Sequence, residues 1–204
     1  MPSLRTKPVP SRHVEEKRSR RRREILHSAL RAFRERGFHE TTLDDIAERL
    51  GVRRTALYHY FPDKEAILHA CHLEALEDLK RIVREARRLG TAAGRLAHVI
   101  REHVRVMTDT LEGSPLGIEV TAFSPEHRAG IVAARDRYER ALRETIAEGI
   151  RGGEFRAVDP KIAAFAILGA INWIARWYRP GGSIDAPGLG QQFADHLVGG
   201  LTCD

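Results

Sequence analysis

The stretch Thr41–Leu68, TTLDDIAERLGVRRTALYHYFPDKEAIL, decides the fold of this end of the chain through its helix starts and stops. Thr42 followed by Asp45 is typical of a capping box, and apolar residues then recur at helical spacing until a glycine at position 51 ends the pattern. A second short helix is predicted from Arg53 to about Tyr60, before a Pro-Asp pair that breaks it and caps the next helix. Two short helices around a glycine-bearing turn are typical of a helix-turn-helix.

Upstream of this motif, apolar residues at helical spacing predict a helix that begins at Arg20 and ends before Gly37. Phe38 is placed to pack back onto the last turn of that helix. Residues 1–19 hold three prolines and scattered charges without apolar periodicity, which predicts a flexible basic arm.

Downstream of the motif the helical pattern continues, with glycine and proline breaks between its segments. We expect helices at Lys64–Leu89, Ala92–Leu111, Pro125–Arg151, Pro160–Tyr178 and Pro187–Leu201, and a short one at Leu116–Phe123. Nothing in the pattern resembles a strand ladder. The predicted fold class is all-α, with an N-terminal three-helix helix-turn-helix domain at 20–64 and a C-terminal helical domain at 65–204.

Positive charge is concentrated at the N-terminal end. The formal net charge of the 204 residues is +6, and a content of 42% hydrophobic and 30% charged residues is typical of a soluble globular protein. Residues 1–64 hold 16 Lys or Arg against 9 Asp or Glu, whereas the rest of the chain holds 18 against 19. A basic region on a nearly neutral body indicates that one end meets a polyanion, and a solvated basic face has the same composition.

The sequence offers little for catalysis, metal binding or secretion. It has no glycine-rich phosphate loop, nucleophile elbow, HExxH or paired-carboxylate motif, so we expect no enzymatic activity and no cofactor. Cys71 and Cys203 lie far apart, which argues against a disulfide framework. His69, Cys71 and His72 cluster without a fourth ligand, so we expect helix-surface residues and no metal. Charge and proline at the N-terminus, in place of a signal peptide, predict a cytoplasmic protein.

The quoted stretch resembles the DNA-binding domain of the TetR family of transcriptional regulators. The resemblance rests on Thr42, Ile46-Ala47, Gly51-Val52, Leu57-Tyr58, Phe61 and Lys64-Glu65. Upstream, Ala29, Phe33, Gly37 and Phe38 fit the family's first helix, so the match covers about a quarter of the chain. The resemblance implies a homodimer that binds double-stranded DNA and a helical body that binds a small molecule.

The third helix of such a domain must enter a major groove about 12 Å wide and present polar side chains to base edges. We expect Arg54 to read guanine and Thr55 to read a second base, while Arg53 contacts either a base or a phosphate. By the family's pattern, the sugar-phosphate backbone is contacted by Thr42, Tyr58, His59, Tyr60 and Lys64. Either a minor-groove contact or a disordered tail is expected of Arg5, Lys7, Arg12, Lys17, Arg18 and Arg20–Arg23.

Several of these residues have a structural alternative. Thr42 caps its helix whatever else it contacts, and Tyr58 packs as well as reaching outward. His59 has the alternative of an ordinary exposed histidine. Leu57 and Phe61 are expected in the core.

The segment Ile162–Tyr178, IAAFAILGAINWIARWY, is apolar nearly all round, with Asn172 and Arg176 as its polar residues. At 17 residues it is at the short limit for a membrane span. We expect it to be buried on two sides, against its own domain and against a symmetry mate, as in the family's four-helix dimer interface. The final helix supplies the other half through Leu189, Phe193, Leu197 and Leu201. A homodimer also places two recognition helices about 34 Å apart on a palindromic operator.

Residues 153–182, GEFRAVDPKIAAFAILGAINWIARWYRPGG, resemble the acyl-CoA-responsive branch of the family, which represses fatty-acid, steroid and related catabolic operons. The expected ligand-binding residues are Phe123, Arg128, Arg135, Trp173, Arg176 and Trp177. The tryptophans and the arginine between them suit the adenine and a phosphate of coenzyme A, and equally suit packing in an interface. The other two arginines are phosphate candidates or plain surface residues. Either an acyl tunnel or ordinary core is expected from Leu111, Leu116, Ile118, Phe123 and Ile131.

Residues and resemblance together predict a repressor that binds a palindromic operator as a homodimer and is released by a small-molecule inducer, with a CoA thioester as the expected class. The alternative is a repressor of a drug-efflux or aromatic-compound operon that responds to a lipophilic small molecule. A non-specific architectural DNA-binding protein is disfavoured, because it would not need a large neutral helical domain. No membrane partner is expected.

Overall fold

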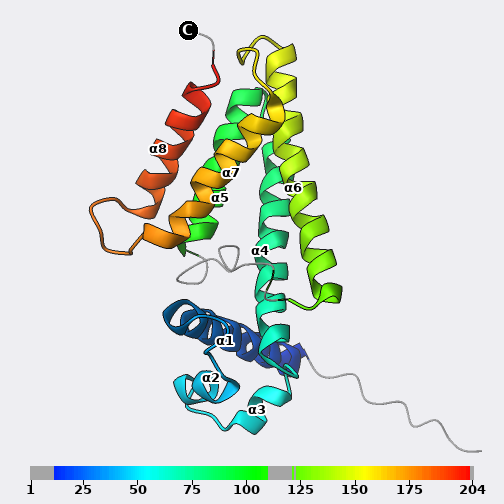
Figure 1. The fold of residues 1–204 in the computed structure, drawn as a ribbon, viewed down its shortest axis with the longest axis vertical. Coiled ribbons are helices and arrows are strands. Elements are labelled where there is room, and N and C mark those ends of the chain that lie inside the picture. The colour runs from blue at the N-terminus through cyan, green and yellow to red at the C-terminus, as the bar shows by residue number, and fades with distance from the viewer. Residues whose placement is uncertain (1–11, 110–120, 122, 203–204) are drawn as a thin grey trace, which may run out of the picture.

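The computed structural model describes residues 12–109, 121 and 123–202. Across these residues the chain is helical, and its one extended pairing is a bridge between Phe155 and Thr202. The helices are α1 Arg12–Arg36, α2 Leu43–Arg49, α3 Arg54–Tyr58, α4 Lys64–Ala86, α5 Ala92–Asp109, α6 Pro125–Arg151, α7 Pro160–Trp177 and α8 Ala186–Gly199. Figure 1 shows a three-helix head, α1 to α3, below a taller helical body. The predicted fold class is confirmed.

Helix α1 begins at Arg12, earlier than the start at Arg20 that apolar periodicity predicted. Its first turns bury no side chain, so the apolar pattern gives no sign of them. Charge pairing supports them instead, because Glu15 lies in the first turn and Arg12 Nε donates to Glu16 Oε1 at 3.0 Å. Residues 12–19, expected in a flexible arm, are therefore helical, and residues 1–11 lie outside the described chain.

The helix-turn-helix has the predicted capping box at the start of α2. Thr42 Oγ1 accepts from the backbone N–H of Asp45 at 3.2 Å, and Asp45 Oδ2 accepts from the N–H of Thr42 at 2.8 Å. Gly51, in the turn between α2 and α3, has a φ of +62°, which favours glycine. The turn and both short helices therefore follow from local signals.

Helix α4 joins the head to the body, and Figure 1 shows it rising from the one into the other. It packs against α1 of the head and against α5 and α6 of the body, and the start of α6 already meets its first turn at Glu65. This double contact corrects one expectation, because Cys71 and His72 are fully buried instead of lying on the helix surface. Cys71 Sγ lies 3.9 Å from the carbonyl oxygen of Leu26 in α1, and the His72 ring meets Phe123 edge to face at 4.9 Å.

The body is organised around α5, which contacts α4, α6, α7 and α8. The predicted breaks between helices are confirmed at Gly153, with a φ of +73°, and at Gly181, with a φ of +80°. After the first break, the N–H of Arg156 donates to the carbonyl oxygen of Leu201 at 2.8 Å, which ties the α6–α7 connection to the end of the chain. The short helix expected at residues 116–123 falls almost entirely outside the described residues. Among the described helices, none has the length and apolar character needed to cross a membrane.

Candidate DNA-binding interface and effector cavity

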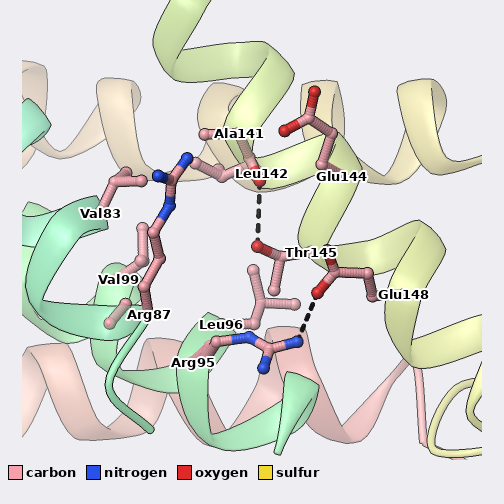
Figure 2. Close-up of a pocket in the computed structure, with 11 residues that line it drawn as sticks. Val83, Arg87, Arg95, Leu96, Val99, Ala141, Leu142, Glu144, Thr145 and Glu148 are labelled. Carbon is pink, nitrogen blue, oxygen red and sulfur yellow. Dashed lines mark hydrogen bonds and ion pairs between the residues drawn. The ribbon is translucent and has the colours of Figure 1, made fainter.

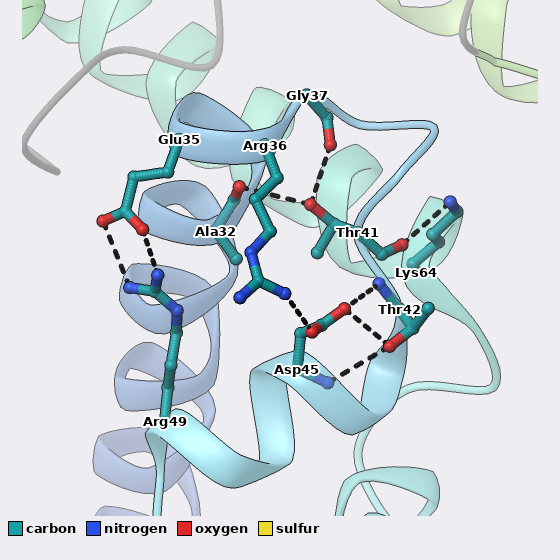
Figure 3. A network of polar contacts seen from close by, with 9 residues as sticks. All are labelled: Ala32, Glu35, Arg36, Gly37, Thr41, Thr42, Asp45, Arg49 and Lys64. Carbon is teal, nitrogen blue, oxygen red and sulfur yellow. Dashed lines mark hydrogen bonds and ion pairs between the residues drawn. The ribbon is translucent and has the colours of Figure 1, made fainter.

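A network of polar contacts holds α1, α2 and the turn between them in one arrangement (Figure 3). Thr41 is buried, and its hydroxyl lies 2.7 Å from the carbonyl oxygen of Gly37 and 3.2 Å from that of Ala32. Two ion pairs span the helices nearby, Arg36 with Asp45 and Arg49 with Glu35. These contacts therefore fix α1 and α2 relative to each other, and α3 is presented from this fixed pair.

Helix α3 is a short helix that turns polar side chains to solvent. Arg54 and Thr55, which are expected to read bases, and Arg53, which is expected on either a base or a phosphate, are all exposed. Leu57 and Phe61 are 1% and 4% exposed, which confirms the prediction that they belong to the core. One face of the segment thus anchors it while the opposite face is free to meet a duplex.

Arg54 is held in position by two neighbours. Its Nη1 donates to Asp44 Oδ2 at 2.9 Å, and its Nε donates to the Tyr58 hydroxyl at 2.9 Å. The guanidinium carbon also lies 5.5 Å from the centre of the Tyr58 ring. The hydrogen bond that Arg54 donates to the Tyr58 hydroxyl and the nearby Asp44 carboxylate raise the pKa of Arg54, so the side chain remains a cation.

The expected backbone-contacting residues surround α3 on the same head. Tyr58 is 47% exposed, and Thr42 and His59 are also exposed. Tyr60 is half-buried against the core, which leaves less of it free than of Tyr58. The structure thus brings the predicted DNA-facing side chains of α3 and the start of α2 to one end of the molecule.

Lys64 has a structural role that the sequence pattern did not indicate. Its ammonium donates to the carbonyl oxygens of Phe38, His39 and Thr41 at 2.8, 2.7 and 2.9 Å. It also lies 4.8 Å from the centre of the Phe38 ring. An ammonium has three donors, so all of them serve the loop between α1 and α2.

Part of the basic N-terminal stretch is also committed to the protein itself. Arg21 pairs with Glu24 at 2.6 Å, and Arg22 pairs with Glu74 of α4 at 3.0 Å. Arg22 also lies 5.1 Å from the centre of the Phe61 ring. The exposed cations in the N-terminal half of α1 include Lys17, Arg18, Arg20 and Arg23.

The start of α4 is joined to the start of α6 by an acid-histidine contact. Glu65 Oε1 accepts from the N–H of Ser124 at 2.9 Å and lies 2.8 Å from His127 Nδ1. The hydrogen bonds from Ser124 and His127 lower the pKa of Glu65 to about 2. The His127 ring stacks on His69 with centroids 4.1 Å apart, and burial, followed by nearby His127, lowers the pKa of His69.

The body contains a cavity of about 670 Å³ whose lining comes from four helices. This volume is within the usual range for small-molecule sites. Leu76 and Leu79 come from α4, His103 from α5, and a larger set from α6 and α7. That set is Arg135, Asp136, Tyr138, Glu139, Arg140, Arg143, Lys161, Phe165, Leu168, Gly169 and Asn172.

The two ends of this cavity, hereafter the effector cavity, differ in burial and charge. Its inner end holds buried residues, namely Leu76, Leu79, His103 and Tyr138. Its outer end holds exposed residues, namely Asp136, Arg140, Lys161, Phe165, Gly169 and Asn172. Cations outnumber acids in the whole lining, and burial lowers the pKa of Arg135. The arrangement suits an amphiphile with an apolar inner part and an anionic outer part.

The predicted ligand residues lie in three separate places. Arg135 lines the effector cavity. Phe123 is buried beside His72, and Arg128 Nη2 donates to the carbonyl oxygen of Phe123 at 2.9 Å. Trp173, Arg176 and Trp177 are exposed on α7. Of the expected tunnel, Phe123 and Ile131 are buried, and Leu111, Leu116 and Ile118 lie outside the described residues.

A smaller cavity of about 290 Å³ lies between α4, α5 and α6 (Figure 2). Its polar groups are largely committed to each other. Arg95 pairs with Glu148 at 2.6 Å, and the Thr145 hydroxyl donates to the carbonyl oxygen of Ala141 at 3.0 Å. This cavity is therefore a weaker candidate for an effector than the larger one.

Helix α7 presents an exposed apolar face. Ile162 is 64% exposed and Trp173 is 63% exposed, and Phe165 and Trp177 are about half exposed. The opposite side is buried in the body through Ala164, Ile167, Ile171 and Ile174. The helix is thus buried on one side, and its other side offers the large apolar surface that an interface requires.

Sequence reasoning missed most of the cavity lining. Leu76, His103, Tyr138 and Lys161 carry no shared motif, and they come from four different helices. The only sequence signal for these residues was a lone histidine and a lone tyrosine on amphipathic helices. Such residues belong to the ordinary core more often than to a ligand site. In the described part of the chain, no group of three or more His, Cys, Asp or Glu is placed to hold a metal ion.

Comparison with known proteins agrees with this arrangement. Residues 25–71 match the family model described as bacterial regulatory proteins, tetR family, and residues 89–201 match that of the tetracyclin repressor-like C-terminal domain. The HTH-type transcriptional repressor KstR2 of Rhodococcus jostii is 30% identical over 91% of this chain and 93% of its own.

Two solved structures extend the comparison. The ketosteroid transcriptional regulator KstR2 of Mycobacterium tuberculosis superimposes with a TM-score of 0.83 at 26% identity, covering 90% of this chain and 96% of that one. AibR in complex with isovaleryl coenzyme A and operator DNA gives a TM-score of 0.76 at 28% identity, covering 89% and 98%. With its helix-turn-helix head and helical body, the chain therefore belongs to the TetR family of DNA-binding transcriptional regulators.

Proposed function

We propose that this protein is a repressor that binds a palindromic operator as a homodimer and is released from it by an acyl-CoA thioester. The observation that carries the inducer class is the effector cavity, with its buried inner end free of formal charge and the excess of cations over acids in its lining. A CoA thioester combines an apolar acyl group with several phosphate charges, so it matches both ends. The crystal structure of the related AibR with isovaleryl coenzyme A supports this choice.

In the proposed complex, α3 enters the major groove. Arg54 and Thr55 read bases, Arg53 contacts a base or a phosphate, and these three are exposed at the start of the helix. Thr42, Tyr58, His59 and Tyr60 contact the sugar-phosphate backbone. Lys64 supports these contacts indirectly, because its ammonium holds the loop that precedes α2.

The homodimer forms in this proposal through the exposed apolar face of α7, defined by Ile162, Phe165, Trp173 and Trp177. Phe165 also lines the outer end of the effector cavity. A ligand in the cavity therefore touches the helix that contacts the partner, and this link favours coupling between ligand binding and the spacing of the two heads. Trp173 and Trp177 serve the interface in this arrangement.

Footprinting and inducer release test the proposal. DNase footprinting on genomic fragments should reveal a discrete palindrome, whereas uniform protection of all fragments would overturn the assignment of a specific repressor. Acyl-CoAs should release the protein from the protected site, while the matching free acids and lipophilic cations should not. Release by a lipophilic cation alone would favour the efflux-type alternative, which the excess of cations in the cavity disfavours.

A further inference from the structure

One residue that lines the effector cavity has a buried polar atom without a hydrogen-bond partner in the described part of the chain. His103 of α5 is 1% exposed, and its Nε2 makes no hydrogen bond with any described residue. A buried nitrogen without a partner costs free energy, so such groups are rare in folded proteins and need an explanation. A ligand atom in the cavity would supply the missing partner.

The other nitrogen of the same ring is already engaged. The Tyr138 hydroxyl lies 3.0 Å from His103 Nδ1, and the two rings meet edge to face with centroids 5.3 Å apart. Burial lowers the pKa of His103 to about 3 and raises the pKa of Tyr138, so the imidazole is neutral and the phenol keeps its proton. A neutral imidazole has one N–H, and with the phenol donating to Nδ1 that N–H is at Nε2.

The surroundings of His103 define the rest of the ligand's inner end. Leu76 and Leu79 supply apolar walls and are almost fully buried. A carboxylate placed here would lose its hydration beside a neutral imidazole, which is costly. A ketone needs a single donor and carries no charge, so it fits this end at much lower cost.

We propose that His103 is a specificity-determining residue whose Nε2–H donates to a neutral carbonyl oxygen on the buried part of the effector. Tyr138 is then a positioning residue, because its hydroxyl occupies Nδ1 and fixes the ring proton on Nε2, the nitrogen left without a partner among the described residues. The proposal rests on the proposed function in taking this cavity as the effector site. It adds that the protein selects effectors with an oxygenated inner end over those with a purely hydrocarbon one.

Nitrogen NMR of the full-length protein, with histidine labelled by ¹⁵N, tests this directly. The probe pair is cyclohexanone and methylcyclohexane, which have similar size and differ in the carbonyl oxygen. The His103 signals, assigned by their loss in His103→Phe, should show a protonated Nε2 that shifts saturably with the ketone, with a dissociation constant on the order of millimolar. Equal shifts with both probes, no saturable shift, or an unprotonated Nε2 would each overturn the proposal.

Variants provide a second measurement through the methyl signals of Leu76 and Leu79. His103→Phe should lose about tenfold in ketone affinity, while His103→Gln, which keeps an N–H near the Nε2 position, should lose less. Tyr138→Phe should weaken ketone binding without removing the donor. The matched control is His98→Gln on the same helix. The His98 Nε2 is likewise buried without a partner in the described part of the chain, but His98 does not line the cavity, so ketone affinity should be unchanged. Undiminished ketone preference in His103→Phe overturns the proposal even if one variant unfolds.

These outcomes separate the inference from the proposed function. Ketone binding at His103 without release of DNA by any acyl-CoA would leave the inference standing and reject the inducer class. Release by acyl-CoAs without any response of His103 to the ketone would support the inducer class and reject the inference.

Discussion

At the scale of single residues, the head of the protein orders its charged side chains before DNA arrives. Arg54 is held by Asp44 and Tyr58, so part of the entropy cost of fixing a long side chain is met in the free protein. To bind a guanine, Arg54 must still release Asp44, because the Asp44 carboxylate and the guanine would accept hydrogen bonds from the same guanidinium. Lys64 is fixed more completely, by three carbonyl oxygens of the α1–α2 loop. Arg54 is therefore only partly held and stays at the exposed surface, whereas the ammonium of Lys64 is used to hold the α1–α2 loop.

We expect Arg54→Ala to lose about 1–3 kcal/mol of discrimination at one base pair, because a bidentate contact to guanine is removed. The measurement is a set of binding titrations on operators that each carry a single base-pair substitution. At the position read by Arg54 the variant should tolerate every base about equally. A uniform loss on all the operators would instead assign Arg54 to the phosphate backbone.

Replacing Lys64 by methionine should destabilise the head by about 1–3 kcal/mol, because carbonyl oxygens that accept from a charged donor lose it. Urea unfolding of the free protein measures this. The slope of operator affinity against salt concentration should stay close to wild type. If stability is unchanged and the slope falls by about one ion, Lys64 contacts phosphate as the family pattern suggested.

At the scale of elements, α4 connects the two domains through consecutive residues at its first turn. Lys64 contacts the loop of the head, and Glu65 contacts Ser124 and His127 at the start of α6. A shift of α6 against α4 would therefore act on the residue next to the one that holds the head. The contacts of Lys64 and Glu65 thus bring the start of α6 next to the residue that braces the α1–α2 loop of the head.

Glu65→Gln should reduce stability in a pH-dependent way. The folded-state pKa of Glu65 is lowered from 4.5 to about 2, so its ionised form stabilises the fold above its unfolded pKa. That contribution should be complete at neutral pH and disappear as the pH falls from about 4.5 to about 2. Urea unfolding across this range should show the stability difference between wild type and variant shrinking toward acid.

The control for this measurement is Glu77→Gln on the same helix, whose carboxylate makes an exposed pair with Lys80. It should change stability little at any pH. A Glu65→Gln difference that does not depend on pH would contradict an ionised contact to Ser124 and His127.

Gly149 of α6 marks the close contact between that helix and the connection that follows it. A Cβ at this position would overlap the ring of Phe155, which is buried. Gly149→Ala should therefore destabilise the body by about 1–3 kcal/mol, measured by urea unfolding. Gly130→Ala on the same helix has open space and should be neutral or slightly stabilising. Similar effects of the two substitutions would show that the ring moves aside freely.

At the scale of the whole molecule, the proposed function depends on joining two copies of the chain at the right spacing. Helix α7 has more exposed large apolar side chains than any other described helix, and Figure 1 shows α7 in the body, away from the head. A dimer formed there leaves both heads free to reach a duplex. The effector cavity borders the same helix through Phe165, so ligand and partner act on neighbouring surfaces.

Trp173→Glu should convert the proposed dimer into a monomer of about 23.0 kDa, because a charge would be buried in the interface formed by the α7 face. We expect a loss of at least about 2 kcal/mol in dimerisation, with a matching loss of operator affinity. Sedimentation equilibrium measures the mass. Val132→Glu, an exposed apolar position on α6, is the matched control and should remain dimeric. A Trp173→Glu dimer as stable as wild type would place the interface elsewhere.

The sequence alone determined the helices, their breaks and the helix-turn-helix. Capping by Thr42 and Asp45, and the φ of Gly51, arise within a few residues, so a linear pattern contains them. It did not predict the first turns of α1, because their charge pairs leave no apolar period.

The tertiary structure decided what depends on packing between distant segments. Cys71 and His72 are buried because α1 covers α4 at Cys71, and Phe123, just before α6, covers it at His72. The sequence of α4 itself does not predict these contacts. The effector cavity depends on the same effect, since Leu79, His103 and Tyr138 meet only when three helices pack together. Local interactions are present in the sequence, whereas a cavity and its unpaired nitrogen exist only after the chain has folded.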